Sequence, residues 1–199
     1  HAGDLMDRRK FVNFSILSQV RTRFIQRLKD ENIQFHCILG NHDVYYRNTN
    51  EINSLNELFS NDITVYNTPS IVNFDGLDIA LLPWVNKTNH DESVEFIKTA
   101  SAPILIGHLE LDGYQVMRGV DYRGGMDPKL FDRYERVISG HFHCRHTQDN
   151  VDYLGTQYQI TFADLKEAKG FHILDTDTRE LEFIENPYKM FHRLVYDDS

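Results

Sequence analysis

Two distant stretches of this sequence share one design, in which a short apolar run ends in glycine and polar side chains follow. The apolar residues 35–39 precede the sequence GNHD at 40–43, and Val137 and Ile138 precede GHFH at 140–143. A buried strand that ends in this way can build a site at the carboxyl edge of an α/β sheet. Both imidazoles of the second stretch would point to one side of an extended chain. The adjacent Asn41 and His42 would diverge, so the pattern predicts a metal cluster with a separate acid–base residue.

Two further stretches complete the pattern. Residues 3–8 read GDLMDR, and GHLE at 107–110 follows the apolar residues 104–106. Glycine thus leads four times into a possible ligand: Asp4, Asn41, His108 and His141. Imidazoles with carboxylate and amide oxygens suit Mn, Fe or Zn better than a calcium cage made only of oxygens. A carboxylate such as Asp4 can bridge two ions about 3.5–4 Å apart.

These four motifs, in this order, resemble those of the calcineurin-like metallophosphoesterases. The chain is most similar to the nuclease subunit of SbcCD-type recombination and repair complexes, in the short bacteriophage recombination-endonuclease version. Trp84 after a strand, LELDG after His108 and YLGT at 153–156 support this choice. The resemblance implies an α/β fold of two facing mixed β-sheets flanked by helices (α/β/β/α). It also implies phosphodiester hydrolysis in DNA with two divalent metal ions, Mn first, with Mg, Fe or Zn as alternatives.

The resemblance further implies a role for each site residue. It assigns five side chains to the metals: Asp4, Asn41, His108, His141 and His143. Asp4 would bridge the two ions, and His143 would belong to the first. A metal-activated hydroxide would attack the phosphorus. His42 would then protonate the leaving group, with Asp43 beside it to orient the imidazole.

The ends of the chain depart from the family pattern. The family opens with a strand that carries an Asp-x-His pair, and no such pair precedes Gly3. Since one βαβ unit takes about 30 residues or more, we expect a missing segment of that size. We therefore expect a half-built metal site and impaired activity in this chain. We also expect a nuclease domain over residues 1–186, with 187–199 leading toward a capping domain.

Hydrophobic periodicity and turn residues give the expected elements. Helices are expected at 14–31, 52–59, 92–98 and 127–131. Strands are expected at 34–39, 63–66, 70–74, 77–82, 103–106, 136–139, 151–154, 157–162, 170–175 and 180–184. Residues 109–125 contain four glycines and read as a long connection, a possible substrate gate beside the metal site.

Composition fits one globular domain, and the resemblance implies that it acts in the cytoplasm of a bacterium or of a phage-infected host. The 199 residues contain no apolar run long enough to span a membrane and no visible secretory signal. The two cysteines, Cys37 and Cys144, do not make a disulfide framework. Reduced thiols are expected. By resemblance, the partners are DNA, an SbcC-like ABC-type ATPase subunit and a second copy in a homodimer.

The net charge of −9 argues against a strong duplex binder. Two divalent ions would reverse the field at the one place where a phosphodiester must lie. Five side chains are candidates for holding the substrate: Arg8, Tyr45, Arg47, Arg118 and Tyr122. Stacking and phosphate binding by such residues favour single-stranded or frayed ends.

Two alternatives remain open at this stage. The chain could be another calcineurin-like enzyme, a phosphatase or a small-molecule phosphodiesterase. It could also be a non-catalytic scaffold, if the first motif is truly absent from the gene.

Overall fold

The computed structural model describes residues 1–197, which fold around a six-stranded mixed sheet in the order β3-β4-β5-β8-β10-β9. Its strands are β3 (Ser70–Phe74), β4 (Leu77–Leu82), β5 (Ile104–Gly107), β8 (Arg136–Ser139), β9 (His146–Gln148) and β10 (Val151–Tyr153). The four central strands are parallel, and the edge strands β3 and β9 run antiparallel to their neighbours. The carboxyl ends of β4, β5 and β8 therefore meet at one edge.

The two faces of this sheet are covered by different layers, because successive side chains alternate between them. On one face, Leu105 and Val137 pack in a core with Ile97 of α4 (His90–Thr99) and with Phe131 of the 3-10 helix η2 (Pro128–Phe131). On the other face, Ile79, Ile104 and Ile138 pack against a second layer of strands.

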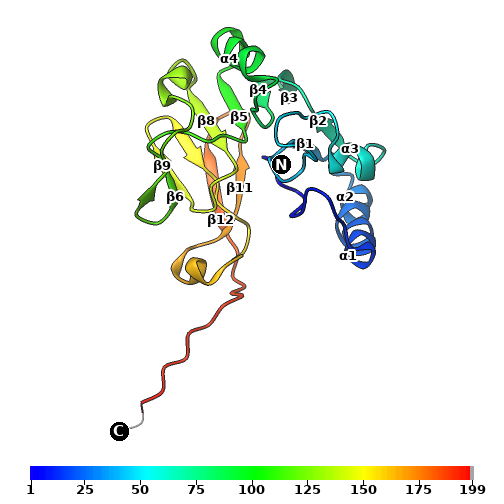
Figure 1. The fold of residues 1–199 in the computed structure, drawn as a ribbon, viewed down its shortest axis with the longest axis vertical. Helices are drawn as coiled ribbons and strands as arrows, with labels where there is room; N and C mark the ends of the chain where they lie inside the picture. Colours follow the sequence, from blue (N-terminus) through cyan, green and yellow to red (C-terminus); the bar gives the residue numbers. More distant parts are fainter. Residues whose placement is uncertain (198–199) are drawn as a thin grey trace.

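The second layer consists of two separate strand pairs. β1 (His36–Ile38) and β2 (Thr64–Tyr66) are parallel, and β11 (Gly170–Leu174) and β12 (Leu181–Glu185) are antiparallel. Outside it lie α3 (Ser54–Phe59) and a helix built from α1 (Phe14–Gln19), a π-helical turn (Val20–Ile25) and α2 (Gln26–Asp30) (Figure 1). The predicted α/β/β/α class is confirmed.

Three segments differ from expectation. Residues 157–162, predicted as a strand, are irregular and lead into a 3-10 helix, Phe162–Lys166 (η3). The reason is a capping box, in which the Asp164 carboxylate accepts hydrogen bonds from the Ile160 and Thr161 amides. The predicted connection 109–125 contains a hairpin of β6 (Gln115–Met117) and β7 (Val120–Asp121), and the sequence did not predict β9.

Figure 1 also locates the two ends of the described chain. The N-terminal residues lie between β1 and the large sheet. Residues 187–197 contain no helix or strand; the amides of Met190 and Phe191 donate to Gln159 Oε1, and the chain beyond them extends away from the domain. Cys37 and Cys144 are buried free thiols, as expected. Within residues 1–197, no helix has the length and apolarity that a bilayer crossing requires.

Candidate metal centre

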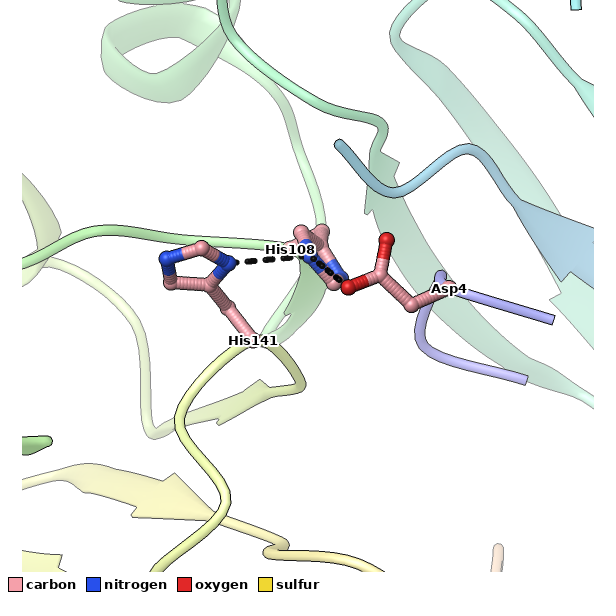
Figure 2. Close-up of side chains that lie close together, drawn as sticks. All are labelled: Asp4, His108 and His141. Atoms are coloured by element: carbon pink, nitrogen blue, oxygen red, sulfur yellow. Dashed lines mark hydrogen bonds and ion pairs between the residues drawn. The ribbon is translucent and has the colours of Figure 1, made fainter. Parts of the chain in front are cut away.

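Four predicted ligands converge where the carboxyl ends of the strands meet the N-terminal loop. Asn41 follows β1, His108 follows β5 and His141 follows β8. Asn41 Oδ1 lies 3.0 Å from both His108 Nε2 and His141 Nδ1, and the two nitrogens are 3.1 Å apart. Asp4 Oδ2 is 3.3 Å from His108 Nε2. Figure 2 shows Asp4, His108 and His141, a possible metal site, facing one point.

The other nitrogen of each imidazole is anchored away from this point. His108 Nδ1 is 2.7 Å from the carbonyl oxygen of Ala2, and His141 Nε2 is 3.0 Å from the Glu110 carboxylate. Both partners only accept hydrogen bonds, so each anchored nitrogen carries a proton. In the neutral rings, His108 Nε2 and His141 Nδ1 then direct lone pairs at each other and at Asp4. This arrangement calls for a positive charge between them and matches histidines oriented for metal binding.

The Asn41 amide fits this interpretation. With its oxygen inward, it adds a further lone pair to the cluster. With its nitrogen inward, it would donate to both imidazoles and to Asp4, while its oxygen would accept from Arg9 Nη2 at 3.3 Å. A cation selects the first orientation, because amide oxygens bind metal ions and amide NH₂ groups do not.

Electrostatics tie Asp4 to His108. Burial by itself lowers the pKa of His108, but the hydrogen bond and charge of Asp4 outweigh it and leave that pKa raised. Burial raises the pKa of Asp4, and His108 and His42 together bring it below its usual value. Both net shifts have the same cause, the attraction between the Asp4 carboxylate and the His108 imidazole.

The glycines of the motifs allow the loops to approach each other. A Cβ on Gly40 would lie 2.2 Å from Asp4 Oδ1, and one on Gly140 would lie 2.2 Å from the Ala2 carbonyl oxygen. A Cβ on Gly3, whose φ is +86°, would lie 2.4 Å from His108 Nδ1. Two ligands, Asp4 and His141, adopt positive φ themselves, at 58° and 78°. Such backbone strain is typical of functional sites.

Asp43 has a role other than the expected contact with His42. Its carboxylate accepts hydrogen bonds from the amides of Asp4 and Gly40 at 2.8 Å and of Met6 at 3.0 Å. Within residues 1–197 no hydrogen bond joins it to His42. Burial raises the pKa of Asp43 to about 6, against the opposing effect of these backbone donors. Asp43 thus fixes the GDLMDR loop to the GNHD loop.

His42 is exposed and oriented by backbone groups. Its amide donates to Asp4 Oδ1 at 2.7 Å, and its Nδ1 is 2.7 Å from the carbonyl oxygen of Asp7. Since a carbonyl only accepts, Nδ1 carries a proton and Nε2 is left for other chemistry.

His143 is exposed and is not among the three titratable side chains that converge in residues 1–197. Its loop is held from behind by buried Lys169, whose Nζ donates to the His143 carbonyl oxygen at 2.8 Å and pairs with Asp164.

Two depressions flank the cluster. The first, here called the Trp84 cavity, has a volume of about 510 Å³ and is lined by Trp84, Val85, Asn86, Lys87, His90, Asp91, His108, Leu109, Glu110, Gly124, Gly125 and Met126. The second, here called the basic groove, has about 720 Å³ and is lined by Asp7, Arg8, Arg9, Lys10, Phe11, His42, Tyr45, Tyr46 and Arg47. His108, a predicted ligand, lines the first, and His42, the neighbour of Asn41 in the chain, lines the second, so both depressions border the site.

The predicted substrate-binding residues divide between these regions. Arg8, Tyr45 and Arg47 line the basic groove. Arg118 is exposed next to β7, and the Tyr122 hydroxyl donates to Glu110 Oε2 at 3.3 Å, so Tyr122 supports the residue that anchors His141.

Sequence reasoning missed the roles of Glu110 and Arg9. The motif GHLE contains Glu110, but nothing in it shows that this carboxylate turns back to His141 of another loop.

Comparison with known proteins places this geometry in a family context. A family model described as "Calcineurin-like phosphoesterase" matches residues 1–145. The chain is 37% identical over 196 residues to "Exonuclease subunit 1" of Enterobacteria phage T4, covering 98% of this chain and 57% of that protein. It is 27% identical over 107 residues to an SbcCD nuclease subunit of Staphylococcus epidermidis, covering 43% of this chain and 29% of that protein. The chain thus spans little more than half of the phage relative.

Among solved structures, a "Novel Archaeal Phosphodiesterase" aligns with a TM-score of 0.38 at 16% identity, over 85% of this chain and 79% of that one. At this TM-score the likeness supports no conclusion about function.

Proposed function

We propose that this chain, which belongs to the calcineurin-like phosphoesterase family, is the nuclease subunit of a DNA recombination or repair complex. The observation that carries the proposal is the convergence of Asp4, Asn41, His108 and His141, with ligand atoms inward and both histidines anchored outward. The phage exonuclease subunit and the staphylococcal SbcCD nuclease subunits support DNA as the substrate.

In this proposal, two divalent metal ions, Mn first among the candidates, would when bound supply positive charge for the phosphoryl oxygens and an activated water. Asp4, Asn41, His108 and His141 would hold the second ion, and His143 together with the shared Asp4 would hold the first. His42 supplies the proton. Its Nδ1–H to the Asp7 carbonyl fixes the ring, and Nε2 delivers a proton to the leaving oxygen as the P–O bond breaks.

Asp43 is a positioning residue in this scheme. By holding the amides of Asp4 and Gly40, it sets the distance between the bridging carboxylate and the loop of Asn41 and His42. The Asp43 carboxylate is occupied by these amides and does not orient the His42 imidazole.

The proposal extends to the assembly. Residues 1–186 form the nuclease domain. An ABC-type ATPase and a second copy of the chain are the partners, in the bacterial or phage-infected cytoplasm. Arg8, Tyr45 and Arg47 contact the DNA strand, and Arg118 extends that surface.

The test combines metal binding with substrate choice, in the gene's full-length product and in this chain. We expect Mn-stimulated cleavage of DNA by the full-length product, with single-stranded or frayed ends preferred. In this chain we expect calorimetry to show one tight Mn site, lost in His141→Ala. Hydrolysis of phosphomonoesters or cyclic nucleotides with DNA untouched would instead establish a phosphatase or small-molecule phosphodiesterase.

A further inference from the structure

The basic groove is locally positive, although the molecule as a whole is acidic. Four basic side chains, Arg8, Arg9, Lys10 and Arg47, line it with one carboxylate, Asp7, although the whole chain carries −9. Arg8 and Asp7 are 3.6 Å apart and highly exposed, so water screens the pair and most of the charge of Arg8 remains effective. A local positive field in an acidic protein points to an anionic ligand at this place.

Three aromatic rings lie among these charges. Tyr45 is already engaged, because Lys10 Nζ lies 5.2 Å from its ring centroid and the Tyr46 ring packs against it at 4.7 Å. Phe11 and Tyr46 remain 76% and 50% exposed. Rings of this kind, interleaved with cations, bind a chain that alternates phosphates with bases, since any base can stack on an aromatic face.

Arg9 connects the groove to the ligand cluster. It lines the groove, it lies close enough to Asp4 for their charges to attract, and its Nη1 is buried without a hydrogen-bond partner in residues 1–197. An unpaired guanidinium donor is costly, and an additional phosphate oxygen on the groove side would relieve that cost.

We infer that the basic groove binds the single-stranded segment of DNA on the leaving-group side of the scissile bond. This inference rests on the proposed function, because the orientation comes from His42. Its proton goes to the leaving oxygen, so the strand that departs must continue from the wall that contains His42. Phe11 and Tyr46 stack its bases, Arg47 and Arg9 hold its phosphates, and Tyr45 supports Tyr46.

The experiment measures binding with no catalysis. Fluorescence anisotropy in a chelating buffer compares labelled oligothymidylate with an abasic oligomer of equal length, which has the phosphates without the bases. The variants are Phe11→Leu and Tyr46→Leu, with Tyr158→Leu as the matched control, because Tyr158 is also 50% exposed and lies outside the groove. Circular dichroism checks that each variant is folded.

We expect each groove variant to weaken oligothymidylate binding about 5- to 150-fold and to leave abasic binding unchanged. Tyr158→Leu should change neither. Equal losses on both oligomers, or no loss on either, would overturn the inference. Binding of polyglutamate as tight as that of oligothymidylate would show an acidic polypeptide site and overturn it as well.

Failure of the proposed function would look different. Because the chelated chain performs no hydrolysis, stacking in the groove can be present even if the full-length protein with Mn leaves DNA intact. Conversely, Mn-dependent DNA cleavage that is insensitive to Phe11→Leu and Tyr46→Leu would support the nuclease and exclude this groove.

Discussion

The ligand cluster and the basic groove are neighbours built in opposite ways. In the cluster, His108 is buried, both imidazoles have a second anchor, and glycine Cα atoms leave no room for a side chain. In the groove, Phe11 and Tyr46 are exposed, and weak contacts such as the Lys10–Tyr45 pair predominate. Metal ions require fixed distances, whereas a strand of any sequence requires surfaces that adapt. The comparison predicts that cluster changes affect every substrate and groove changes affect only polymers.

The largest effect is expected from His141→Ala. Loss of a ligand nitrogen leaves an incomplete site, so bound metal and hydrolysis should both fall to background on DNA and on a nitrophenyl phosphodiester alike. Metal analysis and both assays measure this in the full-length protein. His172→Ala is the control, since His172 packs against Phe183 in the β11–β12 hairpin. Retained metal in His141→Ala would contradict its role as a ligand.

His42→Ala tests the boundary between the two regions. We expect about 10²- to 10⁴-fold slower DNA cleavage with metal content intact, the usual contribution of a general acid. The loss should be smaller for a nitrophenyl diester, whose leaving group needs no proton. If the variant loses metal as His141→Ala does, His42 is a ligand and the assignment is wrong.

Glu110→Gln should have a smaller effect on the cluster. The amide can still accept a hydrogen bond from His141 but lacks the negative charge, so metal affinity should fall about 10- to 100-fold. Calorimetry with Mn measures the change, and the exposed Glu182→Gln serves as the control. Unchanged affinity would show that the His141–Glu110 pair does not support the site.

The smallest effect is expected from charge in the groove. Removing one phosphate contact from single-stranded DNA should reduce the slope of log affinity against log salt by about 0.7. Arg47→Gln should show this reduction, and Arg27→Gln, an equal change of charge on α2, should not. Identical slopes for the two variants would mean that the overall charge, and not the groove, attracts the strand.

The sequence predicted that Asn41, His108 and His141 lie together, because each directly follows a glycine near a strand end. Strand polarity then brings Asn41, His108 and His141 together regardless of the loops between them. The hydrogen bonds between the loops, in contrast, could not be predicted from any pattern in the sequence. Adjacency suggested that Asp43 serves His42, but its carboxylate turns inward to the amides of another loop.

The same limit explains the misassigned strand. Residues 157–162 have the composition of a strand, yet the backbone amides of Ile160 and Thr161 donate to the Asp164 carboxylate. The Gln159 carboxamide oxygen accepts hydrogen bonds from the amides of Met190 and Phe191. These side-chain hydrogen bonds compete with the ladder that a strand requires. Likewise, the sequence around Tyr45 and Tyr46 does not show which of the two rings is the more exposed.

The hydrogen bond from His108 to Ala2 has a consequence for how the molecule folds. It joins residues 106 positions apart, and the contact of Asn41 with His141 spans 100. Contacts this distant in sequence carry a large entropic cost, so they form after local hairpins and helices. We therefore expect the ion site to be among the last parts of the chain to be assembled. A partly folded chain offers no place for the metal, and bound Mn would stabilise the completed structure alone.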